Sequence, residues 1–277
     1  MNARDIVDYI KLEHTVFDLP FIYAGVVIAS RGTFLPLKYL IILVTAVSAR
    51  ATGMSINRIA GLKYDKINPR KKDWALVTGK MKLVDAYILT AVLMAVFELS
   101  TYALNRTVLM LSPIVIAFFI VDPLLKRVTV WRHLFMGFTI GLGVAGGFLA
   151  VTPIFPPPII YIVVMISTFW IAGFDIIYTI PDIEYDRKNN LKTLNSKYGL
   201  KKGMIVSYIF HILTIILFIS IAFIVKNIYY DILLLPIIAL IIYEHIEVNE
   251  NDMKSIRVSF FNANSFIGFI FLIGMVI

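Results

Sequence analysis

Four side chains that could bind a cation recur at helical spacing in the second half of the chain: Asp175, Tyr178, Asp182 and Asp186. At about 100° of rotation per residue, Asp182 and Asp186 each lie within about 20° of Asp175, and Tyr178 lies within about 60°. Closely grouped carboxylates are what a hard divalent cation needs. The spacing therefore predicts a stripe of cation-binding oxygens, although Pro181 should interrupt the helix just before Asp182.

A second polar cluster lies earlier in the chain, at the end of an apolar stretch. Arg50, Asn57 and Gly61 share one helical stripe, and Asp65 falls about 80° from Asn57. A basic segment that includes Arg70 follows directly. Charged groups in or beside an apolar span are costly to bury, so they usually mark a site.

Together the two clusters suit a lipid diphosphate. Carboxylates and an asparagine carbonyl suit Mg²⁺, which usually joins one or two carboxylates to substrate phosphates. Lysine and arginine suit the remaining phosphate oxygens, and the apolar stretches suit a lipid tail. Departure of diphosphate would leave an electrophile in a water-poor cavity, which is an allylic cation if the lipid is an isoprenoid. Taken singly, residues such as Asp186 are equally consistent with solvated helix caps.

The elements that must position these residues are membrane helices. The chain has 277 residues, of which 59% are hydrophobic, and a mean hydropathy of +0.84. Its excess apolar area must face lipid, so the sequence predicts an integral membrane protein. The net charge of +8 does not indicate nucleic-acid binding, because basic loops in a membrane protein first report how the chain is oriented in the bilayer. There is no cysteine and therefore no thiolate chemistry.

Nine apolar stretches are long enough, or nearly so, to cross a bilayer. Because they are continuous rather than alternating, they predict an all-α, multi-pass bundle and exclude a strand barrel. We expect one membrane domain over 1–277, with nine helices around a central cavity. The expected spans are roughly 15–30, 37–61, 83–103, 107–125, 132–152, 157–180, 203–225, 230–246 and 258–277.

The basic residues are distributed unequally between the two sides of this bundle. Of the 26, twenty fall on the side of the N-terminus, two lie inside the second span, and four lie on the other side, namely Arg31, Lys38, Arg106 and Lys226. This positive-inside signal predicts a cytoplasmic N-terminus and a cytoplasmic site. The long loops 62–82 and 181–202, which carry the two clusters, lie on that side.

These residues resemble the UbiA superfamily of intramembrane aromatic prenyltransferases over nearly the full chain. The most specific match is FDIIY at 174–178 with DIEYDRK at 182–188. The earlier motif matches through Arg50, Gly53-Met54, Asn57-Arg58, Asp65 and Asn68-Pro69-Arg70. The strings look most like the 4-hydroxybenzoate polyprenyltransferase branch and its relatives in menaquinone synthesis.

The resemblance implies Mg²⁺-dependent transfer of a polyprenyl group from its diphosphate to a small aromatic acceptor, in quinone biosynthesis at the plasma membrane. It assigns Asn57, Asp65, Asp182 and Asp186 to the metal. It assigns Asp175 and Tyr178 to catalysis within the cavity. The candidate substrate-binding residues are Arg50, Asn57, Arg70, Lys126, Arg127 and Tyr178. Beyond the bilayer and these substrates, we expect no nucleic acid and no obligate protein partner.

Three positions depart from the family pattern. The acid that usually follows the asparagine by four residues is Gly61, an expected cation of the next loop is replaced at Trp74, and a common tyrosine is Asp122. Asp65, a water or Asp122 could replace the missing ligand. Two alternatives therefore stay open: the same fold with a naphthoate, haem or glycerol-lipid acceptor, or a lipid-diphosphate-binding protein without turnover.

Overall fold

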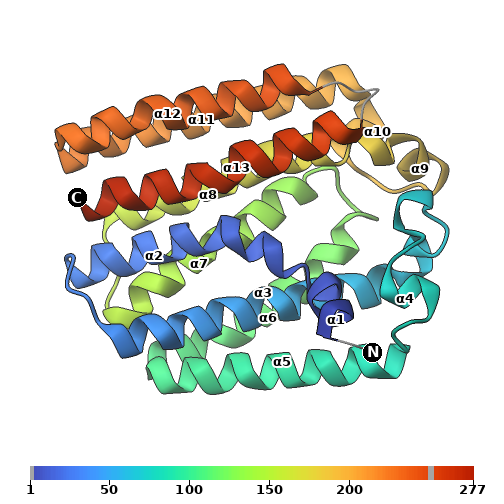
Figure 1. The fold of residues 1–277 in the computed structure, drawn as a ribbon, viewed down its shortest axis with the longest axis horizontal. Helices are drawn as coiled ribbons and strands as arrows, with labels where there is room; N and C mark the ends of the chain where they lie inside the picture. Colours follow the sequence, from blue (N-terminus) through green and yellow to red (C-terminus); the bar gives the residue numbers. More distant parts are fainter. Residues whose placement is uncertain (1–2, 249–252) are drawn as a thin grey trace.

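The computed structural model describes residues 3–248 and 253–277, and the side chains of 5–248, 256 and 264–277. These residues form helices and connecting loops, with no strand among them. The long helices run side by side across the molecule (Figure 1). They are α2 (Thr15–Ser30), α3 (Pro36–Asp65), α5 (Leu83–Leu104), α6 (Arg106–Leu125), α7 (Arg132–Val151), α8 (Pro158–Tyr178), α11 (Leu200–Val225), α12 (Ile228–Glu247) and α13 (Met253–Val276).

Short helices gather at one end of this bundle, which we call the loop end (Figure 1). They are α1 (Ala3–Ile10), α4 (Ala75–Thr78), α9 (Ile183–Lys188) and α10 (Leu194–Tyr198), with 3₁₀ turns at Leu12–His14, Pro69–Lys71 and Ile180–Asp182. Both predicted long loops, 62–82 and 181–202, are thus partly helical and lie at the same end.

The prediction of a multi-pass membrane bundle is confirmed. Within the described residues, eight helices are long and apolar enough to cross a bilayer, and the segment Asn264–Val276 of α13 is a shorter apolar helix. A ninth crossing, and the cytoplasmic orientation of the N-terminus, stay predictions. Lys254 and Arg257, which contribute to the charge asymmetry, lie outside the described side chains, as does Arg4.

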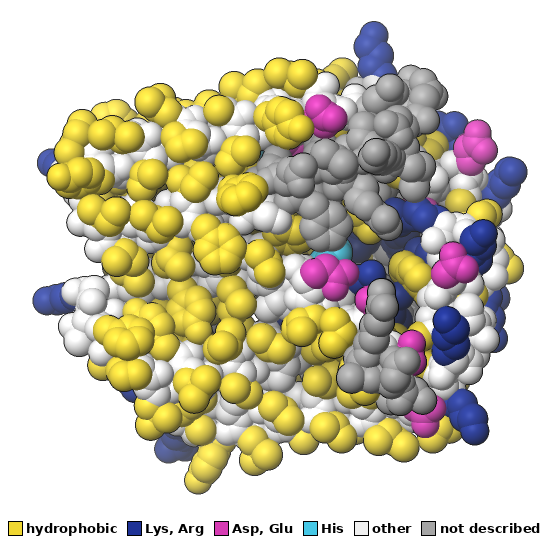
Figure 2. All heavy atoms as spheres, viewed as in Figure 1, with side chains coloured by type: hydrophobic (Ala, Val, Ile, Leu, Met, Phe, Trp, Pro, Cys, Tyr) yellow, Lys and Arg dark blue, Asp and Glu magenta, His cyan; other side chains and the backbone are white. Residues whose placement is uncertain are grey.

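The surface is divided in the way that a bilayer requires. Hydrophobic side chains cover the lengths of the helices on the visible face, and lysine and arginine side chains gather mainly at the loop end (Figure 2). Exposed apolar residues such as Phe223, Leu235 and Tyr102 are 68–74% accessible. Such side chains are stable only against lipid, so the helical flanks are the membrane-facing surface.

Close packing between helices depends on glycines of α7. A β-carbon at Gly137 would lie 2.3 Å from the carbonyl oxygen of Thr168 on α8, and one at Gly147 would lie 2.3 Å from that of Ile22 on α2. These two glycines therefore allow α7 to approach α8 and α2 closely. Gly146 is different, because a β-carbon there would meet nothing within 4 Å. Gly146 therefore borders open space rather than a neighbouring helix.

This difference gives a matched pair of substitutions. Gly137→Ala is expected to destabilise the bundle by about 1–3 kcal/mol, because α7 and α8 must move apart to accommodate the methyl group. Gly146→Ala adds the same methyl group without a clash and should leave stability nearly unchanged. The thermal unfolding midpoint of each variant in detergent measures the effect. Equal midpoints for the two variants would contradict the close approach of α7 and α8.

Candidate active site

The first half of the site forms where α3 ends. The helix stops at Asp65, and Asn68 begins the 3₁₀ turn Pro69–Lys71, where its side-chain oxygen accepts a hydrogen bond from the backbone N–H of Arg70 at 2.9 Å. Asparagine is well suited to this capping position because its short side chain reaches its own backbone. The cap fixes the direction in which Arg70 leaves the turn.

The second half forms where α8 ends. The helix stops at Tyr178, and Pro181 lies in the 3₁₀ turn Ile180–Asp182 before α9 begins. Proline has no N–H to donate and obstructs the preceding turn, so the helix cannot continue. The prediction of one continuous stripe from Asp175 to Asp186 is therefore wrong beyond Tyr178, whereas the predicted interruption before Asp182 is confirmed.

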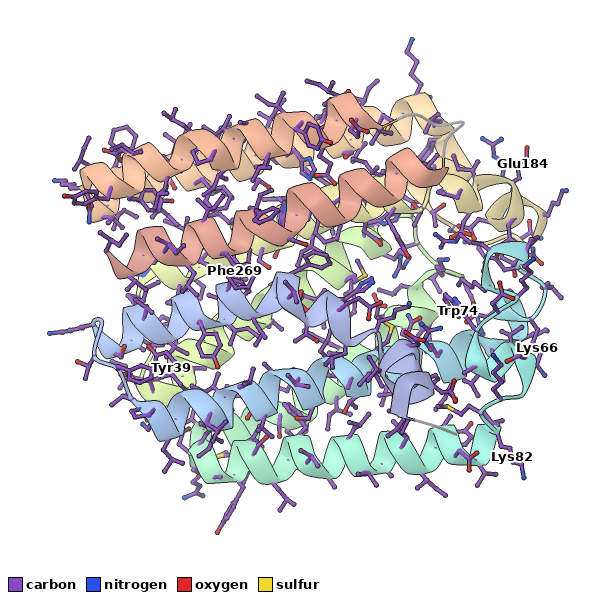
Figure 3. All side chains as sticks on the ribbon, in the orientation of Figure 1. Tyr39, Lys66, Trp74, Lys82, Glu184 and Phe269 are labelled. Atoms are coloured by element: carbon purple, nitrogen blue, oxygen red, sulfur yellow. The ribbon has the colours of Figure 1, made fainter. Side chains whose placement is uncertain are left out.

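These two segments meet at the loop end. Asn68 donates from Nδ2 to Oδ1 of Asp182 at 3.1 Å, and the Arg70 guanidinium forms an ion pair with the other oxygen of that carboxylate. The hydroxyl of Tyr185 donates to the carbonyl of Tyr64. Burial raises the pKa of Tyr185 to about 12, so this donor stays protonated at neutral pH. Figure 3 shows Lys66 and Glu184, from the two loops, at this same end.

A cavity of about 250 Å³ opens between the two segments, which we call the charged cavity. Among the described residues its lining includes eight basic and five acidic side chains, an excess of three positive charges. Such an excess in a partly enclosed space favours a polyanionic ligand. The basic residues are Lys11, Arg50, Arg58, Arg70, Lys71, Lys126, Arg127 and Arg132, and the acidic residues are Asp18, Asp65, Asp122, Asp175 and Asp182.

Nine of the ten residues proposed from the sequence line this cavity: Arg50, Asn57, Asp65, Arg70, Lys126, Arg127, Asp175, Tyr178 and Asp182. Asp186 does not. It is fully buried behind the cavity wall, with one oxygen 3.7 Å from Nζ of Lys126 and the other accepting a hydrogen bond from Thr193 at 3.3 Å. The structure places Asp186 behind Lys126 because α9 begins only after the 3₁₀ turn.

Burial affects both members of this pair. It lowers the pKa of the Lys126 ammonium, and the Asp186 carboxylate opposes that shift. It raises the pKa of Asp186, and the charge of Lys126 opposes that shift in turn. Asp186 therefore stabilises a cation that the cavity presents to its contents. In the structure, Asp186 has the geometry of a residue that positions Lys126.

Asp175 has two partners that sequence reasoning did not identify. Its Oδ2 lies 2.6 Å from Nδ1 of His133 and 3.1 Å from Nη1 of Arg132. Both bases begin α7, about forty residues earlier in the chain, and no spacing pattern connects them to Asp175. The only available signal was the cost of burying Asp175, which requires a partner somewhere. The contacts hold the carboxylate in one orientation at the cavity wall.

Trp74, where an expected cation is missing, stacks against two other cations. The Arg58 guanidinium lies 3.7 Å from the centre of its indole ring, and Nζ of Lys71 lies 4.7 Å from it. Cation–π contact with tryptophan is the strongest of its kind. Trp74 thus holds the positive charge of Arg58 and Lys71 near the cavity. It lies beside α1, close to the loop end (Figure 3).

A second cavity of about 260 Å³, the apolar chamber, adjoins the first. Both cavities share Asp18, Arg50, Phe119, Thr139 and Ile140 in their walls. The rest of the chamber lies between α2, α3, α5, α6 and α7 and is almost entirely apolar, with Gly146 in its wall. A ligand with an anionic head and an apolar tail would fit with its head in the charged cavity and its tail in the apolar chamber.

The oxygen donors of the charged cavity are separated by bases. Asp65 accepts from Nζ of Lys71 at 2.7 Å, and Asp182 pairs with Arg70. Within the part of the chain that the structure describes, no three His, Cys, Asp or Glu side chains converge as a ready metal cluster. Mg²⁺ does not require one, because one or two carboxylates suffice when substrate phosphates supply the other oxygens. The donor set therefore fits Mg²⁺ held together with a phosphate ligand.

Comparison with solved structures confirms the fold. A UbiA homologue from Aeropyrum pernix K1 is 30% identical and superposes with a TM-score of 0.85. The match covers 96% of this chain and 98% of the homologue. A homologue from Archaeoglobus fulgidus, solved with DMAPP and Mg²⁺, superposes with a TM-score of 0.76 at 18% identity, covering 98% of this chain and 99% of its own.

Curated relatives are more distant. A 4-hydroxybenzoate octaprenyltransferase of Nitrosomonas eutropha is 26% identical over 63% of this chain and 61% of its own length. The 4-hydroxybenzoate geranyltransferase 1 of Lithospermum erythrorhizon is 28% identical over 59% and 53%, respectively. The chain thus matches little more than half to three fifths of the length of these two proteins.

The family model for the UbiA prenyltransferases matches residues 19–269, which include α3, α8 and both loops of the charged cavity. The predicted resemblance is confirmed, and the chain belongs to the UbiA prenyltransferase family.

Proposed function

We propose that this protein transfers a polyprenyl group from its diphosphate to a small aromatic acceptor in a Mg²⁺-dependent reaction. The observation that carries the proposal is the contact between the loops after α3 and α8, around a cavity with excess positive charge. A diphosphate is the polyanion that best suits clustered arginine and lysine next to carboxylates. We further propose that this site faces the cytoplasm, in the plasma membrane.

The two cavities suit the two parts of the donor. Arg70, Lys71, Lys126 and Arg127 would hold the phosphate oxygens in the charged cavity, and the prenyl tail would enter the apolar chamber. The shared wall at Phe119 and Ile140 would place the C1–O bond of the donor near the junction. Binding the tail in an apolar space also excludes water from the reacting carbon.

The residues that would hold the metal are Asn57, Asp65 and Asp182, all in the cavity wall. Bound Mg²⁺ would supply Lewis-acid stabilisation of the charge that develops on the departing diphosphate. Asp186 would act through Lys126, from which it is separated by 3.7 Å. The arginines and lysines of the cavity would share the negative charge of the leaving group.

In the proposed reaction, the C1–O bond of the donor breaks and diphosphate leaves with the electron pair. A ring carbon of the acceptor then bonds to C1, and the ring proton on that carbon is lost. The Tyr178 ring, which lines the cavity and lies 5.0 Å from the Arg70 guanidinium, presents an aromatic face suited to a carbocation. Asp175, held by His133 and Arg132, is the proposed proton acceptor.

The proposed acceptor is a 4-hydroxybenzoate-like phenolic acid, in quinone biosynthesis. The names of the two curated relatives support this class, and Arg50 offers a guanidinium in the wall between the cavities. Naphthoate, haem and glycerol-lipid acceptors are the alternatives. Incubation of the purified protein with geranyl or longer diphosphates and each acceptor, followed by mass spectrometry, distinguishes them.

Removal of divalent metal provides the first test of the reaction. Transfer from geranyl diphosphate is expected to fall below detection in excess EDTA and to return on addition of Mg²⁺, because leaving-group stabilisation by a metal contributes several kcal/mol. Donor binding without product from any acceptor, with Mg²⁺ present, would instead favour a lipid-diphosphate-binding protein. Transfer that is unchanged by EDTA would contradict the proposed metal dependence.

A further inference from the structure

We propose that Asp122 is a further carboxylate ligand on the α3 side of the Mg²⁺ site, where it acts with Asn57 in place of an acid at position 61. This inference rests on the proposed function. It names a residue of α6 as part of a site that the earlier motif assigns to α3 and its loop alone.

The end of α6 lies directly against the relevant turn of α3. Oδ2 of Asp122 is 3.5 Å from Nδ2 of Asn57, and Nη2 of Arg127, just beyond α6, is 3.4 Å from the carbonyl oxygen of Ala60. Asn57, Gly61 and Asp122 all line the charged cavity. Asp122 therefore lies beside the stripe of α3 that carries Asn57, although the two residues are far apart in sequence.

Gly61 itself has no side chain to offer, and the Asp65 carboxylate beside it would need to shift by only a few tenths of an ångström to admit one. A β-carbon at position 61 would lie 3.3 Å from Oδ2 of Asp65. Asp65 is held there by Nζ of Lys71, which donates to its other oxygen at 2.7 Å. With glycine at position 61, α6 supplies a carboxylate oxygen next to Asn57.

Asp122 is also less committed to other partners than Asp175 and Asp182 are. Asp182 and Asp175 each accept close hydrogen bonds from two donors. By contrast, the donors nearest to Oδ2 of Asp122 are Asn57 at 3.5 Å and Arg132 at 3.6 Å. Its Oδ1 is buried and has no hydrogen-bond partner in the described structure.

An uncompensated buried carboxylate oxygen is costly and calls for a partner. Charge-assisted contacts shorter than about 3 Å are the norm for a carboxylate paired with arginine, and among the described side chains Asp122 has none. A hard cation beside Asn57 would satisfy the unpaired oxygen with the ligand type that Mg²⁺ prefers. A flip of the Asn57 amide would present its carbonyl oxygen to the same cation, as carboxamide orientation follows the local hydrogen bonding.

The test moves the carboxylate from position 122 to position 61. Donor binding is measured by isothermal titration calorimetry of geranyl diphosphate into the full-length protein in detergent, across a series of Mg²⁺ concentrations. Asp122→Asn is expected to raise the Mg²⁺ concentration for half-maximal donor binding by about tenfold or more. Adding Gly61→Asp to that variant should return this midpoint to within about threefold of the wild-type value. Asp73→Asn, which removes an exposed acid outside the cavity lining, should leave it unchanged.

The outcomes separate this inference from the proposed function. If the wild-type protein binds no donor with Mg²⁺, the proposed function fails. If the wild type binds donor and Asp122→Asn keeps the wild-type midpoint, Asp122 is not a ligand. If the Mg²⁺ concentration for half-maximal donor binding stays raised in the variant with both Asp122→Asn and Gly61→Asp, the proposal that Asp122 replaces an acid at position 61 is overturned. Thermal unfolding of each variant distinguishes the loss of a ligand from misfolding. The Asp122→Glu variant keeps the negative charge and should keep the Mg²⁺ dependence of donor binding.

Discussion

Replacing Asp182 by asparagine is expected to reduce prenyl transfer about 10²–10³-fold, the loss typical when one charge-stabilising group of a preorganised site is removed. The carboxylate joins the two halves of the site, since Asn68 donates to one of its oxygens and Arg70 pairs with the other. Asparagine keeps the shape and can still accept from Asn68, but it removes the negative charge proposed to hold Mg²⁺. The rate of transfer from geranyl diphosphate measures the effect.

Donor affinity with and without metal shows whether the lost charge acted through Mg²⁺. In EDTA, Asp182→Asn should bind diphosphate at least as well as the wild type, because the Arg70 guanidinium no longer faces a carboxylate. With Mg²⁺ present, the variant should lose the affinity that metal adds in the wild type. A general loss of affinity under both conditions would instead indicate that the two loops had separated.

Glu184→Gln is the matched control. Glu184 lies two residues away in the same loop, is exposed, and is absent from the cavity lining. Its conversion to an amide should leave transfer unchanged, because an exposed charge at this distance is screened by solvent. Transfer by Asp182→Asn within threefold of the wild-type rate would remove Asp182 from the proposed metal site.

The sequence predicted those features that depend on neighbours along one helix. Continuous apolar stretches predicted the membrane helices, and Pro181 predicted the end of α8 before Asp182. The convergence of the two motifs also followed from local information. Both motifs end helices on the side of the membrane that the charge asymmetry defines, so their loops could be expected at one end.

Contacts between helices could not be predicted in the same way. The partners of Asp175 are His133 and Arg132, and the neighbour of Asn57 is Asp122. Helical periodicity reports which residues share a face but not which helix packs against that face. Asp186 shows the same limit, because the break after Tyr178 rotates α9 and directs that carboxylate towards Lys126.

The apolar chamber leads to the second large effect, on the length of the donor that is accepted. Gly146→Leu is expected to reduce transfer from long polyprenyl diphosphates at least about tenfold, while transfer from geranyl diphosphate changes little. One methylene that an apolar pocket cannot accommodate changes the free energy of transition-state binding by about 1–3 kcal/mol, and a leucine side chain excludes more than one methylene. Gly146 is suited to this test because a β-carbon there meets nothing within 4 Å and the residue lines the chamber.

Relative values of kcat/KM for geranyl and longer donors measure the shift in the preferred length. Gly146→Ala adds one carbon to the same wall, so it should move the preference only slightly and serves as the size control. The charged cavity lies outside the reach of either change, since Gly146 is absent from its lining. A uniform loss with all donors would therefore indicate disturbed packing of α7, whereas unchanged use of long donors would show that the tail leaves the charged cavity by another route.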